Sequence, residues 1–227
     1  VERSEPPKND FLIEVRKICK EKNIILIFDE CSSGFRETFG GLHKKYNVDP
    51  DMAIFGKTLG NGYAITAVIG KREVMEYAQE TFISSTFWTE RIGPTAALET
   101  LKIMSETKSW EYVTSLGKYL KNVWLDLARK HNLDIFFNGI YPLISYQIKS
   151  DNFLKYKTYI TQEMLKSGYL ASTTCYLSTA HNKKIIDDYS VHLDRIFSKI
   201  SKCENGLNDI NKLLETEVSH STFQRLN

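Results

Sequence analysis

A continuous apolar segment that ends in two carboxylates constrains the fold of this chain more than any other feature. The segment covers residues 24–28 (IILIF), and Asp29 and Glu30 follow it directly. A run without polar alternation is typical of a strand that is buried on both faces, as in parallel sheets covered by helices. We therefore expect an α/β domain in which Asp29 lies at the carboxyl end of a buried strand.

A second apolar run ends in a lysine where the first ends in an aspartate. Residues 52–55 form this run, Gly56 and Lys57 follow it, and the pattern predicts a third strand over 63–69. Because ligands of open α/β sheets bind at the carboxyl ends of strands, Asp29 and Lys57 are placed to meet over one ligand. The strands alternate with amphipathic helix patterns at 11–22, 71–80 and 93–105, the rhythm of βαβ units.

Many α/β proteins end strands in an aspartate and a lysine, and such a pair is also what the cofactor pyridoxal 5'-phosphate (PLP) needs. Its aldehyde reacts with a lysine amine, and a carboxylate keeps its ring nitrogen protonated, so that the ring withdraws electrons from the substrate. The pattern also has plain structural explanations. Asp29 can serve as a helix cap or a surface ion-pair partner, and Lys57 as an exposed lysine that ends a strand.

The pattern changes after residue 105, where a smaller α+β arrangement is expected. The predicted elements are helices over 110–131, 154–167 and 183–202 and strands over 134–137, 143–148 and 174–177. Gly168 follows the second of these helices, at a position that glycine favours after a helix end. We expect part of a PLP-binding large domain over 1–105, a small domain over 106–205 and a polar tail over 206–227.

The charge balance and the cysteines argue against several other classes of function. The chain has 30 basic and 28 acidic residues, which gives no electrostatic reason to expect nucleic acid or a membrane surface as partner. No apolar run reaches the roughly 18 residues of a membrane span. The cysteines show no metal-ligand spacing, so we expect no metal site, and their scatter suits a reducing, cytoplasmic location. They are Cys19, Cys31, Cys175 and Cys203.

The residues around the two strand ends are more specific than their spacing. Asp29 lies within residues 27–36 (IFDECSSGFR), and Lys57 lies within residues 47–63 (NVDPDMAIFGKTLGNGY). In order and separation these segments resemble the signature of class III aminotransferases, in which Asp-Glu ends a strand before Gly-Phe-Arg, and V-x-P-D precedes a strand, Gly-Lys and a glycine-rich turn. The resemblance continues through residues 85–88 (STFW) to about residue 202.

The resemblance implies the PLP-dependent transferase fold, the aspartate aminotransferase-like fold, and a role for five residues. Lys57 would form the Schiff base with PLP, and Asp29 would face the pyridine nitrogen. Thr86 would bind the cofactor phosphate across a dimer interface, which implies a homodimer. Cys31 stands where the family usually has a valine packed on the cofactor ring, and Ser32 lies where relatives place a side chain near the ring hydroxyl.

The resemblance also implies the activity, a PLP-dependent aminotransferase acting on a small-molecule amino donor and acceptor. Within the family the chain is most similar to glutamate-1-semialdehyde 2,1-aminomutases, so intramolecular amino transfer is an alternative. Family members are much longer, and their N-terminal half, with its phosphate cradle, has no counterpart here. A fragment, one piece of a split enzyme and a catalytically silent remnant that needs a partner are all consistent with this length. An unrelated α/β binding domain is the remaining alternative.

Overall fold

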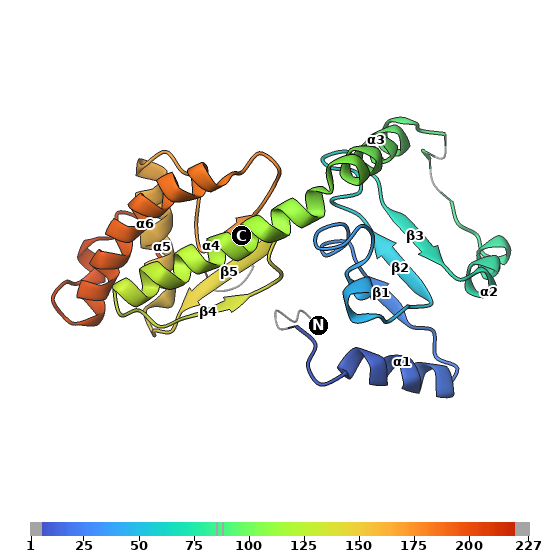
Figure 1. Cartoon of the computed structure of the whole chain (residues 1–227), viewed down its shortest axis with the longest axis horizontal. Coiled ribbons are helices and arrows are strands. Elements are labelled where there is room, and N and C mark those ends of the chain that lie inside the picture. Colours follow the sequence, from blue (N-terminus) through green and yellow to red (C-terminus); the bar gives the residue numbers. More distant parts are fainter. Residues whose placement is uncertain (1–5, 85, 88, 221–227) are drawn as a thin grey trace. The chain divides into compact units, whose positions relative to one another are not determined.

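The computed structural model describes residues 6–84, 86–87 and 89–220 (Figure 1). The chain divides into two compact units, and the division falls between Thr114 and Ser115, within helix α4 (Ser109–Lys130). The functional domain limits expected from the sequence stay a prediction. No helix in the described ranges is both long and apolar enough to cross a bilayer.

The unit that starts at Pro6 is built around a three-stranded sheet in the order β1-β2-β3. Strands β1 and β2 are parallel, with Phe28 opposite Ala53, whereas β2 and β3 are antiparallel, with Ala53 opposite Ile69. The elements are α1 (Phe11–Glu21), β1 (Ile27–Asp29), the 3-10 helix η1 (Leu42–Tyr46), β2 (Met52–Phe55), β3 (Ala67–Gly70), α2 (Arg72–Met75), the 3-10 helix η2 (Glu76–Glu80) and α3 (Ile92–Thr107).

The direction and the start of β3 differ from the βαβ rhythm expected from the sequence. A parallel connection needs a crossover of about a dozen residues or more, usually a helix. Residues 56–66 join β2 to β3 by turns and without a helix, with local bonds from Tyr63 N to the Gly60 carbonyl (3.1 Å) and from Ile65 N to the Tyr63 carbonyl (3.0 Å). The chain therefore reverses, and the strand begins at Ala67 instead of at residue 63.

A small core on one face of β2 holds this unit together. Ala53, Phe55 and Leu59 are buried there against Ala97 of α3, with four half-buried side chains packed around them, Phe35, Ile65, Ala67 and Leu101. Apolar burial of this kind contributes about 25 cal/mol for each Å² removed from water. The core lies beside the point where β2 ends, so it fixes the backbone that leads to Lys57.

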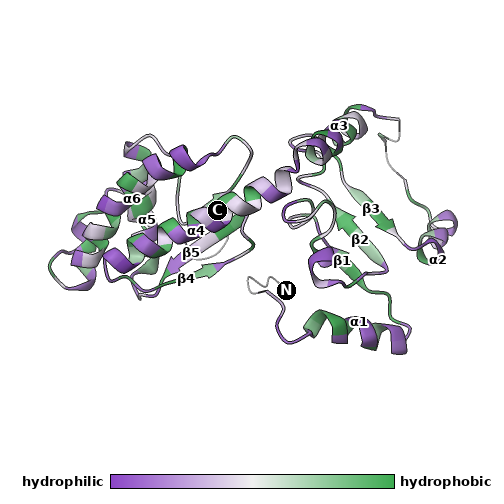
Figure 2. Ribbon diagram, viewed as in Figure 1, coloured by the Kyte–Doolittle hydropathy of each residue, from purple (hydrophilic) through white to green (hydrophobic). Residues whose placement is uncertain are grey.

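The expectation that residues 24–28 are buried on both faces is wrong for this chain. Ile24 is 52% exposed, Ile25 51% and Ile27 49%, and Figure 2 shows the segment that leads into β1 as hydrophobic. The reason is position in the sheet, because β1 is an edge strand that pairs with β2 alone. The apolar composition is evident in the sequence, but the elements that would cover it are not among those described.

The unit that starts at Ser115 is a two-layer α+β arrangement. Its sheet has the order β4-β5-β6, with both strand pairs antiparallel. At its centre Tyr146 of β5 contacts Trp124 of α4 (ring centroids 4.7 Å apart) and Phe197 of α6 (5.8 Å), so both helices cover the same face of the sheet. The elements are β4 (Ile135–Asn138), β5 (Leu143–Ile148), α5 (Phe153–Lys166), β6 (Thr174–Tyr176), α6 (Lys183–Glu204) and the 3-10 helix η3 (Ile210–Lys212).

Candidate active site

The parallel pair β1 and β2 places Asp29 and Lys57 at the same edge of the sheet. Asp29 is the last residue of β1 and lies opposite Ile54 in β2, and Lys57 follows the end of β2 by two residues. Both side chains are exposed. The structure thus brings these two predicted residues to one sheet edge, as the sequence indicated.

A tight turn after β1 connects the two strand ends. The backbone N–H of Cys31 donates to Asp29 Oδ1 at 3.0 Å, and Lys57 Nζ donates to the hydroxyl of Ser32. In the described part of the chain Lys57 forms no ion pair, so a hydroxyl and not a carboxylate faces its ammonium. The turn therefore gathers four of the five predicted site residues: Asp29, Cys31, Ser32 and Lys57.

Lys57 has a backbone conformation that lysine rarely adopts. Its φ angle is +33°, in the left-handed region, where residues other than glycine cost of order 1 kcal/mol or more. The turn that follows accounts for this geometry, because Leu59 N donates to the Gly56 carbonyl at 2.8 Å and Asn61 N to the Lys57 carbonyl at 3.0 Å. Strain of this kind clusters at functional sites, where the surrounding structure over-determines it.

Cys31 lies between the two charged residues. Burial raises the pKa of its thiol above the ordinary value, the neighbouring Asp29 raises it further, and Lys57 opposes the shift. At neutral pH the thiol is therefore protonated and acts as a small apolar group. A side chain at Gly56 would meet Cys31 Sγ at 3.3 Å, so the glycine leaves the sulfur close to the β2 backbone.

Thr86 is not brought to this cluster. It is exposed in the segment between η2 and α3, and among the described residues no hydrogen bond joins it to the strand ends. Ser85 and Trp88 of the same sequence motif lie outside the described residues. The role of Thr86 in binding the cofactor phosphate across a dimer interface stays a prediction.

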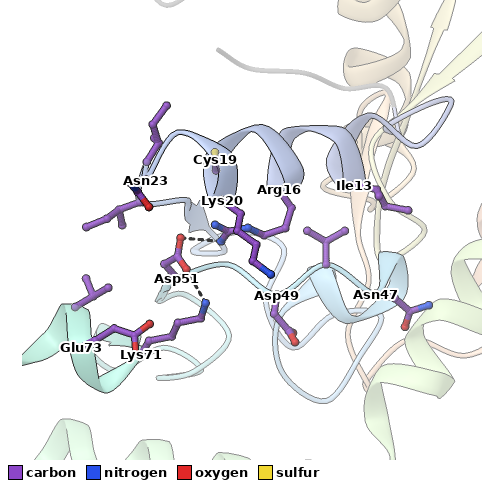
Figure 3. Close-up of a pocket in the computed structure, with 14 residues that line it drawn as sticks. Ile13, Arg16, Cys19, Lys20, Asn23, Asn47, Asp49, Asp51, Lys71 and Glu73 are labelled. Carbon is purple, nitrogen blue, oxygen red and sulfur yellow. Dashed lines mark hydrogen bonds and ion pairs between the residues drawn. The ribbon is translucent and has the colours of Figure 1, made fainter.

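A second charged cluster lies at the opposite ends of the same strands, and the sequence did not reveal it. It borders a pocket of about 610 Å³ between α1, the segment leading into β1, the loop before β2 and α2 (Figure 3). Asp51 accepts hydrogen bonds there from Arg16 Nη1 (2.7 Å), Lys71 Nζ (2.8 Å) and Leu26 N (2.8 Å). Burial opposes ionisation of Asp51, but these bonds outweigh it and hold the pKa of its carboxyl well below the usual range.

The Asp51 cluster is structural. Its one carboxylate pairs with two cations, and Asp51 joins three segments: α1, the start of β1 and the residue before α2. Only long-range contacts reveal this arrangement, because Arg16 and Asp51 are 35 residues apart.

Comparison with known proteins gives consistent matches. The sequence matches the profile of the family "Aminotransferase class-III" over residues 4–189. It is 41% identical to a 3-aminobutyryl-CoA aminotransferase of Cloacimonas acidaminovorans over 113 residues, which cover 49% of this chain and 27% of that protein. It is 31% identical to a glutamate-1-semialdehyde 2,1-aminomutase of Staphylococcus epidermidis over 214 residues, which cover 86% of this chain and 49% of that protein. The chain thus spans half or less of the length of the curated relatives it matches.

Solved structures with the same fold include proteins that carry PLP. The FumI protein of Sphingopyxis sp. MTA144, solved in a form with PLP, superposes with a TM-score of 0.79 at 25% identity over 90% of this chain and 50% of that chain. A transaminase with PLP bound superposes with a TM-score of 0.80 at 19% identity over 88% of this chain and 50% of that chain. The chain therefore has part of the PLP-dependent transferase fold. Together with the matched profile, this shows that the chain belongs to the class III aminotransferase family.

Proposed function

We propose that this chain supplies the lysine and the aspartate of a PLP-dependent enzyme that transfers amino groups. The observation that carries the proposal is the cluster at the β1 and β2 ends. There Lys57, in a left-handed backbone conformation, meets a hydroxyl of the turn that also holds Asp29. Family membership adds the reaction class, and the proteins with similar structures include a transaminase with PLP bound.

The donor set at the sheet edge fits PLP. When bound, PLP withdraws electrons from the substrate carbon that carries the amino group. Lys57 has an exposed amine that can bond to the cofactor aldehyde and later carry a proton to and from the substrate carbon. Asp29 bonds to Cys31 N through Oδ1, and its carboxylate is exposed at the same edge, where it can face a protonated ring nitrogen. The neutral Cys31 thiol provides an apolar contact for the ring, and Ser32 a hydroxyl.

Reductive trapping tests this assignment directly. The chain is incubated with PLP and reduced with borohydride, and the lysines that carry the pyridoxyl group are located by mass spectrometry. We expect Lys57 to be labelled about tenfold more than Lys71, an exposed lysine at the far ends of the strands, which equals a preference of about 1.4 kcal/mol. The Lys57→Ala variant should lose this label and keep the weak label on Lys71. Equal labelling of both lysines in the parent would refute the cofactor role of Lys57 and favour a silent fragment.

Intramolecular amino transfer is a second candidate function. The relatives that align over most of this chain include glutamate-1-semialdehyde 2,1-aminomutases at 28 to 31% identity. The aminotransferase with the higher identity, 41%, matches only 49% of the chain. The two functions differ in one requirement, because an aminotransferase needs a separate amino acceptor for turnover and an aminomutase does not. Turnover of an amino substrate with and without an added keto acid distinguishes them.

The proposed enzyme acts on small molecules as a homodimer in a reducing compartment such as the cytoplasm. Exposed apolar side chains beside Thr86 support the dimer, since Phe82 is 93% exposed and Ile83 57%. Such residues are typical of surfaces that are covered on association. Four free cysteines, among them Cys31, are consistent with a reducing location. Sedimentation equilibrium measures the mass of the assembly.

A further inference from the structure

Glu30 is a buried carboxylate beside the proposed active site, and the mechanism above does not use it. It follows Asp29 directly, but its side chain lies on the other side of the chain and only 4% of the residue is exposed. A buried carboxylate is costly unless it is paired and hydrogen-bonded. The hydrogen-bond partners of Glu30 therefore identify the segments that this carboxylate holds together.

The partners of Glu30 come from two segments of the loop between β1 and β2. Glu30 Oε1 accepts from the backbone N–H of His43 at 3.0 Å and lies 3.1 Å from His43 Nδ1, and Glu30 Oε2 accepts from the hydroxyl of Ser33. No lysine or arginine pairs with Glu30 among the described residues. The carboxylate thus ties the turn after β1 to the start of η1, and we call Glu30, Ser33 and His43 the Glu30 clasp.

The backbone around the Glu30 clasp has the hydrogen bonds and the space that the clasp requires. Glu30 N donates to the Ile54 carbonyl of β2 at 2.8 Å, and Gly34 N donates to the Glu30 carbonyl at 2.8 Å, which closes the turn. Gly41 leaves room for the ring of His43, because a Cβ there would lie 2.3 Å from the ring and 3.1 Å from Glu30 Oε1. Since Gly41 has an ordinary extended conformation, with φ −75°, space and not backbone freedom explains the glycine.

The clasp leads to the proposed active site through Ser32. Ser32 lies in the turn after β1, directly before Ser33. Its carbonyl accepts a hydrogen bond from Arg36 Nε at 2.9 Å. Its hydroxyl accepts the hydrogen bond from Lys57 Nζ. The side chain that faces the lysine amine therefore belongs to a turn whose position depends on Glu30.

We propose that Glu30 is a positioning residue that acts through Ser32 on Lys57. By holding Ser33 and His43 it fixes the turn, so that the Ser32 hydroxyl receives the ammonium of Lys57 and orients it toward the Asp29 side of the sheet edge. The importance of this orientation rests on the proposed function of Lys57. The positional effect itself does not require PLP and can be measured without it.

The test measures the reactivity of Lys57 in the absence of cofactor. The chain is treated with a trace of acetic anhydride at several pH values, and acetylation of Lys57 is quantified relative to Lys71. We expect Glu30→Gln to raise the relative rate roughly fivefold, because the amine is no longer held in a fixed hydrogen bond. The matched control is Glu37→Gln, since Glu37 lies in the same loop, has a side chain only 3% exposed and pairs with Lys45 at 2.5 Å. This control should leave the relative rate of Lys57 within about twofold of the parent.

A double-mutant cycle with Ser32→Ala separates positioning from general loosening of the fold. If Glu30 acts through Ser32, the effect of Glu30→Gln on Lys57 disappears when the Ser32 hydroxyl is already absent. An effect that persists in the Ser32→Ala background, or one that Glu37→Gln reproduces, would overturn the proposal, as would an unchanged rate in Glu30→Gln. Should Glu30→Gln fail to fold, Ser33→Ala removes the bond to Oε2 and decides the same question, whereas His43→Ala would leave the backbone N–H of residue 43 bonded to Oε1. Failure of PLP trapping at Lys57 would refute the proposed function and leave this positional result intact.

Discussion

Replacement of Asp51 by asparagine should destabilise the unit that contains the sheet edge. The new side chain would keep one oxygen for Leu26 N but would present a neutral amide to two cations. Arg16 Nη1 and Leu26 N share Oδ2, so the bond from Arg16 survives but loses about 1 kcal/mol, because a hydrogen bond to a charged group is worth about 1.5 to 3 kcal/mol and one to a neutral group about 0.5 to 1.5. The Lys71 side chain is 47% exposed, so solvent reduces its share to about 0.5 kcal/mol. We expect Asp51→Asn to lower the free energy of unfolding by about 1 to 2 kcal/mol at pH 7.

The same arrangement predicts a pH dependence of known sign. The pKa of Asp51 is held well below its usual range in the folded chain, so folding favours the ionised form. The resulting stability is complete above the unfolded pKa of about 3.9 and is lost as the pH falls toward the folded pKa. Between pH 4 and pH 3 the advantage of the parent over Asp51→Asn should therefore shrink by about 1 kcal/mol.

Urea unfolding followed by far-ultraviolet circular dichroism measures both effects. Asp49→Asn is the matched control, because Asp49 is an exposed carboxylate that borders the same pocket (Figure 3). It should change the unfolding free energy by less than about 0.5 kcal/mol. Equal stabilities of Asp51→Asn and the parent at pH 7 would refute the assigned role of the cluster. A difference that stays constant down to pH 3 would show that shape, and not charge, is what Asp51 contributes.

Two further substitutions test local features of the backbone. Gly117→Ala should lower the unfolding free energy by about 1 to 2 kcal/mol although alanine favours helices, because its Cβ would lie 2.2 Å from the Tyr141 carbonyl oxygen; thermal unfolding measures this, and a stabilised variant would contradict it. Lys57→Gly should be about 1 kcal/mol more stable than Lys57→Ala in urea unfolding, since only glycine adopts the left-handed conformation without strain. The opposite order would show that Lys57 is not strained.

The sequence predicted best those helices whose position depends on the spacing of residues close together in the chain. Helix α4 follows from the periodic placement of apolar residues such as Leu116, Leu120 and Trp124, all of which are buried. Helix α5 ends where Gly168 predicted, with the glycine at φ +84° and Tyr169 N donating to the Met164 carbonyl at 2.9 Å. In these segments the side chains that decide the structure lie within a few residues of one another.

The features that the sequence did not predict depend on residues far apart in the chain. The burial of residues 24–28 depends on other elements that pack against them. An apolar run predicts that such elements are needed, but it does not show that they are present. The bond between Glu30 and His43 joins residues 13 positions apart across a loop with no regular period. The left-handed conformation of Lys57 is imposed by the turn after it, since lysine itself has no preference for it.

The residue clusters at the two ends of the β1 and β2 pair differ in role, since one stabilises the fold and the other positions Lys57. The strands between the clusters are long enough to make the two effects independent. Asp51 at the amino ends joins three segments through two cations and a backbone N–H, whereas Glu30 at the carboxyl ends holds the turn that faces Lys57. Strand β1 has three residues, so roughly 10 Å of paired backbone separates the clusters. Residues this far apart that share no partner usually make additive contributions to stability. Loss of Asp51 should therefore lower stability without altering the reactivity of Lys57, and loss of the Glu30 clasp should alter that reactivity even where the fold survives.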